Sequence, residues 1–446
     1  MHRLFIFDKT KLVAFASFFA YVVSIAIGAV KYLPYQTYAP GVFGTYSIDG
    51  VEFIVLPLIA LLGVALLPKK IVWPSDWFLV IFVIFLLMPT LVLGVSSNNT
   101  SIENKLIIFP TFIGCISMLA AVRNIKIINF NYGKNITIKK NVLYAVFFVW
   151  VVLLIFLVVK YYSVMRFSGV DEIYFQRELT GDVSGLWGYV QLYFTFVFST
   201  FLVAYGLSSG KWAWVVFGSF GYFTMYLITA EKAQLIFPLF FIAINYLVNT
   251  KKNPIKIISI AIASFAAIIF GVVWLGEEVK FFDLAGFYLF SRLIATPSQF
   301  ILDYYDFFSE NGYTFFSQIR GFDIFIDAPS VYASHPKWPQ LGWIVGSGVH
   351  GIESNSNATF IAADGAASLG ALGMVLVTLV LCIYLVFANG LSQKFSKSFW
   401  SIIFAQQAFT LVSGSLFSML LSFGGFFYLM LFVFYKPKKI ISAEVE

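Results

Sequence analysis

Residues 77–95 read WFLVIFVIFLLMPTLVLGV, nineteen residues without a single charged side chain. A helix of about 20 apolar residues covers the hydrocarbon core of a bilayer, and it satisfies its own backbone hydrogen bonds there. Comparable apolar runs recur along the whole chain. A transmembrane barrel would instead show short alternating segments. The runs therefore predict an all-α polytopic membrane protein.

The composition excludes a soluble domain. Of the 446 residues, 60% are hydrophobic and 11% are charged, against about 45–50% and about 25% in soluble domains. The net charge of +7 mostly reflects Lys in the expected cytoplasmic connections, so it does not indicate a nucleic-acid partner. Cys115 and Cys382 both lie in apolar runs, and we interpret them as small packing residues, outside any disulfide or metal framework.

We expect about twelve crossings within a single transmembrane domain that covers residues 1–446. The predicted crossings are 11–30, 51–68, 77–95, 105–122, 142–159, 186–207, 213–229, 235–249, 257–275, 366–388, 400–418 and 421–435.

The basic residues set the expected orientation. With the N-terminus in the cytoplasm, 19 of the 29 Lys and Arg fall in cytoplasmic connections, as the positive-inside rule requires. Twelve crossings also return the basic segment YKPKK, 435–439, to the cytoplasm. Both termini are therefore predicted to be cytoplasmic. Two enlarged outer connections remain, 160–185 and 276–364, and long outer loops usually carry function.

Arginine is distributed against this rule. Lys lies mainly inside, whereas four of the six Arg fall in the outer connections: Arg166, Arg177, Arg292 and Arg320. The planar guanidinium group binds phosphate through two hydrogen bonds, so these residues predict a lipid-linked pyrophosphate at the outer face. The alternative is ion pairing within the first loop, which contains Asp171, Glu172, Glu178 and Asp182.

The segment LITAEKAQLIF, 227–237, places Glu231 and Lys232 in a tight turn between two apolar helices. Charges so close to a membrane are candidates for function. The alternative is a pair whose charged ends simply reach the interface.

The second loop contains FYLFSRLIATPSQFILDYYDFF, 287–308. Its apolar residues at spacings of three and four predict amphipathic helices at the membrane surface, kinked or split by Pro297. On a continuous helix, Arg292 and Asp303 would share a face. Asp303 is a candidate general base. Tyr304 and Tyr305 are candidates for stacking on sugar rings, the alternative being burial against lipid or other helices.

Two histidines follow in SHPKWPQLGWIVGSGVH, 334–350. His350 is a further candidate base, although lone histidines in loops are often structural. The next segment, SNSNATFIAADGAASLGALGM, 354–374, offers Asn357 as a glycan contact. Its small residues allow neighbouring helices to approach closely.

This combination resembles the bacterial oligosaccharide repeat-unit polymerases, the Wzy-type O-antigen and capsule polymerases. The resemblance rests on the helix layout, the two Arg-bearing outer loops, the TAEK turn at 229–232, and the segments SRLIATPSQFILDYYDFF and NATFIAADGAASLGALGM. Lys232 stands where such proteins often carry Arg. Ser354 and Ser356 precede Asn357, in place of the His-x-His-Asn pattern of O-antigen ligases, which favours a polymerase.

The resemblance implies a GT-C-like glycosyltransferase in the bacterial inner membrane, with its active site facing the periplasm. It would transfer a growing glycan from undecaprenyl pyrophosphate to a repeat unit on a second lipid carrier, without metal or cofactor. The pyrophosphate would be bound by Arg166, Arg177, Lys232 and Arg292, and the candidate bases are Asp303, Glu231 and His350. The expected partners are lipid-linked glycans, membrane lipid and a chain-length-regulating co-polymerase.

Two other functions stay open. An O-antigen ligase would share the donor and differ in its acceptor. A lipid-linked oligosaccharide flippase would need charged residues along a central path, whereas most predicted crossings are nearly free of charge. The charge distribution therefore argues against transport.

Overall fold

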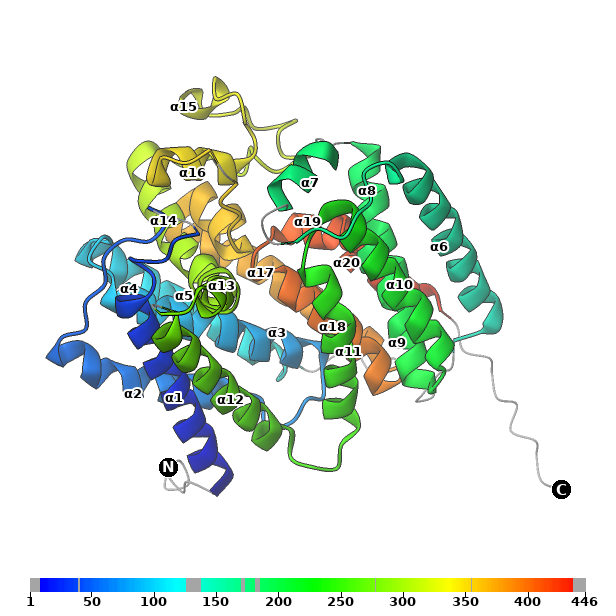
Figure 1. Cartoon of the computed structure of the whole chain (residues 1–446), viewed down its shortest axis with the longest axis horizontal. Helices are drawn as coiled ribbons and strands as arrows, with labels where there is room; N and C mark the ends of the chain where they lie inside the picture. Colours follow the sequence, from blue (N-terminus) through cyan, green and yellow to red (C-terminus); the bar gives the residue numbers. More distant parts are fainter. Residues whose placement is uncertain are drawn as a thin grey trace.

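The computed structural model describes residues 9–38, 41–125, 138–169, 173–180, 185–276, 278–353 and 355–435. Over these residues the named elements are all helical, and an isolated antiparallel β-bridge joins Tyr46 and Ser97. Figure 1 shows the helices packed around one another. The all-helical class expected from the apolar runs is confirmed for the described chain.

The helices are labelled as in Figure 1, and η marks a π-helical segment. The first half contains α1 (Lys9–Lys31), α2 (Gly50–Leu66), α3 (Pro74–Phe82), η1 (Val83–Leu87), α4 (Met88–Ser96), α5 (Ile102–Val122), α6 (Lys140–Tyr161), α7 (Ile173–Thr180), α8 (Leu186–Leu192), η2 (Tyr193–Ser199), α9 (Thr200–Ser209) and α10 (Trp212–Thr229). The second half contains α11 (Ala233–Asn249), α12 (Pro254–Leu275), α13 (Lys280–Gly286), η3 (Phe287–Ala295), α14 (Thr296–Asn311), α15 (Ser330–Ala333), α16 (Leu341–His350), η4 (Ile361–Ala366), α17 (Ala367–Ser392), α18 (Lys397–Thr410), α19 (Leu416–Leu421) and α20 (Gly425–Phe434).

Eight helical segments among the described residues are long and apolar enough to cross a membrane, which is consistent with a polytopic membrane protein. They are Lys9–Lys31, Pro74–Ser96, Ile102–Val122, Lys140–Tyr161, Leu186–Ser209, Pro254–Leu275, Ile361–Ser392 and Leu416–Phe434. The other four expected crossings fall largely on α2, α10, α11 and α18, outside this set. The total of twelve stays a prediction.

One expected crossing, 400–418, is not a single helix. α18 ends at Thr410, and α19 begins at Leu416 after Ser415, whose hydroxyl accepts a hydrogen bond from the backbone N–H of Ser418. A serine in this position caps a helix start, because the first N–H groups of a helix have no partner within it. The segment therefore breaks where the two helices meet.

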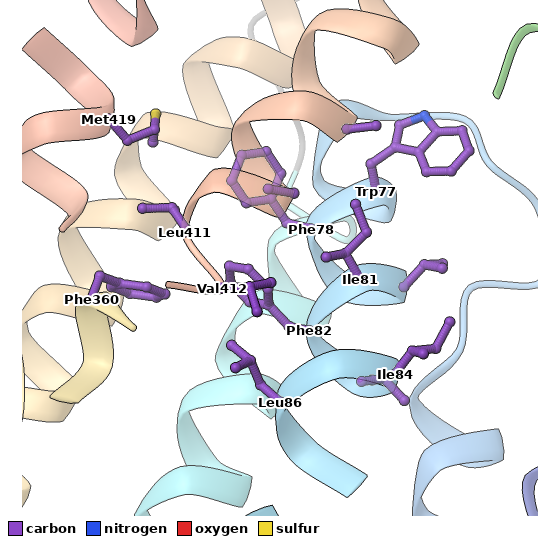
Figure 2. Packing of buried hydrophobic residues seen from close by; sticks show 14 of the residues in the cluster. Trp77, Phe78, Ile81, Phe82, Ile84, Leu86, Phe360, Leu411, Val412 and Met419 are labelled. Atoms are coloured by element: carbon purple, nitrogen blue, oxygen red, sulfur yellow. The ribbon is translucent and has the colours of Figure 1, made fainter. Parts of the chain in front are cut away.

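The apolar stretch 77–95 lies at the centre of the protein. It falls within Pro74–Ser96, whose most apolar window is 89% buried, against 22% for Lys140–Tyr161 at the periphery. Phe78 and Phe82 pack edge-on to each other, and Phe82 lies 5.6 Å from Phe360 between ring centroids. Figure 2 shows Leu411 and Val412, in the turn after α18, and Met419 on α19 in the same cluster. The stretch is thus shielded by protein on nearly every side.

The small-residue run does bring helices together, as expected. Within α17 the backbone leaves helical geometry at Leu369 and Gly370, where Gly370 has φ +57°. A Cβ on Gly373 would lie 2.1 Å from the carbonyl oxygen of Gly365. The positive φ of Gly370 lets the chain reverse, and the missing side chain of Gly373 lets η4 pack directly on α17.

The expected second loop, 276–364, contains a helical segment that runs without interruption over 280–311, through α13, η3 and α14. Pro297 does not split it. The π-helical segment η3 ends two residues before Pro297, and α14 begins at Thr296. Most of α14 is buried, so this helix belongs to the protein interior more than to a membrane surface.

The two expected outer loops lie on the same side of the protein. In Figure 1, α7, α15 and α16 occupy the upper edge, while the connection between α11 and α12 lies at the lower edge. That lower connection holds Lys251 and Lys252, which the topology assigns to the cytoplasm. These segments therefore lie at opposite edges of the protein, and which edge faces the cytoplasm stays a prediction.

Candidate functional site

Two of the three candidate bases, Asp303 on α14 and His350 at the end of α16, lie against each other. Their Oδ2 and Nε2 atoms are 3.3 Å apart, and the side chains are 10% and 4% exposed. Neither atom forms a hydrogen bond among the described residues, and their contact is an ion pair only when His350 is protonated. Buried polar atoms are nearly always partnered in native proteins. An unpartnered pair is therefore a candidate for contact with a ligand.

The pair lines a cavity of about 610 Å³, a size typical of small-molecule sites. Gln299 Nε2 donates to Asp303 Oδ1 at 2.7 Å, and Tyr46 OH donates to Gln299 Oε1 at 3.0 Å. These bonds hold Asp303 Oδ1 and leave Oδ2 facing His350. The carboxylate is thus oriented by a chain of hydrogen bonds that runs from α14 to Tyr46, in the connection between α1 and α2.

Asp306, one turn beyond Asp303, lines the same cavity and was missed by the sequence analysis. Burial raises its pKa from the usual 3.8 to about 6, against the opposing effect of hydrogen bonds from Asn104 and Thr100. Asn104 Nδ2 donates to Asp306 Oδ1 at 2.6 Å. The signal was present, because polar residues recur at 299, 303, 306 and 310, spacings that place them on one face of a helix.

Arg166, in the connection between α6 and α7, lies beside the C-terminal end of α10. Its backbone N–H donates to Leu227 O at 3.1 Å, and its Nε donates to Gln176 Oε1 at 2.7 Å. The guanidinium group also covers the ring of Phe175 at 4.8 Å. Its Nη2 is buried without a hydrogen-bond partner among the described residues. Arg166 therefore has a shielded donor available to an anion.

Gln176 on α7 explains why this arrangement forms. Its Nε2 donates to Val164 O at 2.6 Å, Leu227 O at 3.1 Å and Ile228 O at 3.2 Å. The last carbonyls of a helix have no partner within it, so this fully buried amide satisfies the end of α10 and anchors the first outer loop there.

The turn after α10 carries Glu231 and Lys232. Ala230 ends the helix in the left-handed region at φ +54°. Lys232 Nζ lies 3.5 Å from Tyr288 OH and 4.7 Å from the centroid of its ring, so the turn contacts η3 of the second loop. Glu231 is exposed and accepts a hydrogen bond from Gln234 Nε2 at 2.9 Å. It lines neither of the two cavities described here.

The remaining arginines are spread out. Arg292 is exposed on η3, over the ring of Phe287 at 5.2 Å. Arg320 is exposed, and its Nη1 lies 3.5 Å from Tyr189 OH. Arg177 lies on α7, but its side chain falls outside the described residues, as do the side chains of its four possible acidic partners in that loop. The ion-pair alternative for Arg177 therefore stays open.

Two of the three candidate glycan contacts, Tyr304 and Asn357, line a second cavity of about 540 Å³, which Arg320 also lines. Tyr304 lines it but is 1% exposed, and its OH donates to Ser356 O at 2.9 Å. Asn357 is exposed there. Tyr305 is 5% exposed and is not among the lining residues. Burial of both tyrosines agrees with the alternative of packing among helices.

The candidate bases and the candidate cations occupy separate places. Neither cavity is lined by Arg166, Lys232 or Arg292. Arg292 is exposed whereas Asp303 is buried, and of the two only Asp303 lines the first cavity. Eleven residues of continuous helix separate them, a distance of up to about 16 Å along the helix.

Among the described residues, no group of three or more His, Cys, Asp or Glu side chains is arranged to hold a metal ion. Comparisons with family models, with curated proteins and with solved structures found no match to the chain. The resemblance to repeat-unit polymerases therefore rests on the sequence features alone.

Proposed function

We propose that this protein polymerises lipid-linked oligosaccharide repeat units at the outer face of a bacterial inner membrane. The observation that supports this proposal most is the unpartnered pair of Asp303 and His350 beside a polar cavity. A carboxylate next to an imidazole is suited to take a proton from an attacking hydroxyl group. Glycosyl transfer to a sugar acceptor requires that step.

In the proposed reaction, a hydroxyl of the acceptor sugar enters the cavity and donates to the pair. Its oxygen forms a bond to the anomeric carbon of the donor glycan, and its proton passes to the carboxylate of Asp303, which the His350 imidazole contacts. The bond from the anomeric carbon to the pyrophosphate oxygen breaks, and undecaprenyl pyrophosphate leaves with the electron pair. Gln299 keeps the Asp303 carboxylate in position throughout.

The separation of the cations from this pair assigns them a specific role in the proposal. The anomeric carbon of the donor is joined directly to its pyrophosphate, so a donor bound at Arg292 could not react beside Asp303. An acceptor differs, because its terminal hydroxyl and its own pyrophosphate lie at opposite ends of the repeat unit. We therefore assign Lys232 and Arg292 to the acceptor carrier, together with the shielded guanidinium of Arg166.

Reconstitution in liposomes with lipid-linked repeat units and a chelator tests the proposal. Wild-type protein should produce a ladder of polymer. Asp303→Asn and His350→Gln should each slow chain growth by about 10²–10⁴-fold. Asp323→Asn and His335→Gln are matched controls, because these residues belong to the same loop but line neither cavity. Normal growth in either cavity variant, or an absolute need for divalent metal, would refute the mechanism.

The same vesicles separate the alternatives. A ligase leaves the repeat unit unextended until a glycolipid acceptor is supplied. A flippase moves the unit across the bilayer without lengthening it. Either result, without a ladder, overturns the polymerase proposal.

A further inference from the structure

The cavity beside Asp303 and His350 is acidic. Asp303, Asp306 and Glu310 all line it, and its described lining contains no Lys or Arg. His350 is the single lining residue that can become a cation. An anionic acceptor sugar inside this cavity would therefore meet carboxylates from one long face of α14, and the proposed reaction requires the donor's pyrophosphate to stay outside this lining.

The rest of the lining suits an uncharged polyol. Amide groups come from Asn99, Asn104, Asn311 and Gln299, and hydroxyl groups from Thr100 and Ser101. Carboxylates accept hydrogen bonds from hydroxyl groups, and amides both donate and accept them. Phe307 adds an aromatic surface against which the apolar side of a sugar ring can pack.

The unpartnered pair is an independent sign of a ligand here. Asp303 Oδ2 can only accept a hydrogen bond when ionised, while His350 Nε2 can donate or accept according to its protonation. A single hydroxyl group can donate to the carboxylate and also accept from the imidazole. Both side chains are at least nine-tenths buried, and both line the cavity. One sugar hydroxyl would complete the bonding of both atoms.

We infer that this cavity binds the terminal sugar of the acceptor and selects a neutral or amino sugar over a uronic acid. The inference rests on the proposed function, since it names the substrate class of the same site. Like charges brought together at a binding site strongly disfavour the wrong partner. A positively charged amino group is instead attracted by the three carboxylates.

Binding of simple glycosides to the purified full chain in nanodiscs tests this. The probes are methyl glucoside, methyl glucosaminide and methyl glucuronide, measured by saturation-transfer NMR. The glucuronide should bind at least about tenfold more weakly than the glucoside, because of like-charge repulsion. Equal binding of the two, or no binding by any probe, would overturn the inference.

Charge-neutralising variants locate the effect. Asp306→Asn combined with Glu310→Gln should reduce the preference for glucoside over glucuronide by about tenfold, because it removes two of the three carboxylates that repel the glucuronide. Glu310→Gln alone is the fallback variant, because Glu310 is exposed and its replacement leaves the packing intact. Glu353→Gln is the matched control, an exposed carboxylate outside the cavity lining. An unchanged preference in both cavity variants would contradict the inference.

The two proposals fail separately. A polymer ladder from wild-type protein without any sugar preference would overturn the inference and leave the proposed function standing. A clear sugar preference without a ladder would overturn the proposed function and leave the sugar selectivity of the cavity standing.

Discussion

Replacement of Asp306 by Asn should make the protein more stable at neutral pH, even though it removes a charged group from a polar cavity. The pKa of Asp306 is raised from 3.8 to about 6 mainly because the folded protein buries the carboxyl group. Asn cannot ionise, and its Oδ1 can still accept the hydrogen bond that Asn104 now donates.

The sign and size follow from linkage. Below pH 3.8 the carboxyl is protonated in both folded and unfolded chains, and the variant has no electrostatic advantage. Between pH 3.8 and about 6 the unfolded chain loses its proton first, so wild-type stability falls as the pH rises. A shift of roughly two pKa units corresponds to roughly 3 kcal/mol. Because Asp306 is only partly buried, solvent screening reduces this to about 1–2 kcal/mol.

Thermal unfolding in detergent at a series of pH values measures the difference. The variant should gain stability over wild type as the pH rises from 4 through about 6, and the gain should then stay constant up to pH 8. Asp323→Asn, an exposed carboxylate of the same loop, is the control. A gain that is the same at every pH, or that grows as the pH falls, would refute the reasoning.

Three further predictions address the cations and the packing. Arg292→Gln should slow polymerisation by about tenfold or more, the effect of losing one hydrogen bond to a charged group, while membrane insertion stays normal. The control is Lys337→Gln, which removes another exposed cation that contacts an aromatic ring and should leave polymerisation normal. Gln176→Ala should destabilise the protein by about 1–3 kcal/mol in thermal unfolding, because it leaves buried carbonyl groups without donors, and an unchanged melting curve would exclude its capping role. Gly373→Ala should lower the yield of folded protein in size-exclusion chromatography, because its Cβ would overlap the backbone oxygen of Gly365, and wild-type yield would show that the two segments can separate.

The apolar runs predicted the helices well, but not where they break. A run such as 77–95 carries a strong signal, because burial and bilayer thickness both demand it. The break at Leu369 and Gly370 lies inside an equally apolar run. The break brings Gly373 against Gly365, a contact that becomes visible only when both segments are placed in space.

The candidate site was partly predictable for the same reason. Asp303 and His350 could each be selected as titratable residues of an outer loop, but their contact depends on the path of α15 and α16 between them. Helical and strand periodicity relate only residues within one element, so they do not predict a contact between residues this far apart in the chain. Helical periodicity could have predicted Asp306, which shares a face of α14 with Asp303. The sequence prediction instead named the neighbouring tyrosines, Tyr304 and Tyr305. Those tyrosines are buried among helices.

The unbroken helix over 280–311 has a geometric consequence. It carries Tyr288 and Arg292 near one end and Asp303 further along, and a helix resists changes in its own length. In the proposed reaction the helix therefore fixes the distance between the phosphate of the acceptor carrier and the reacting hydroxyl group, since this distance depends on the number of helical residues between their binding sites. A shorter glycan would not reach the cavity from the bound phosphate, and a longer glycan would have to bend away from the helix. One full helical turn added between Arg292 and Asp303, about 5.4 Å, would shift the preferred substrate toward longer repeat units.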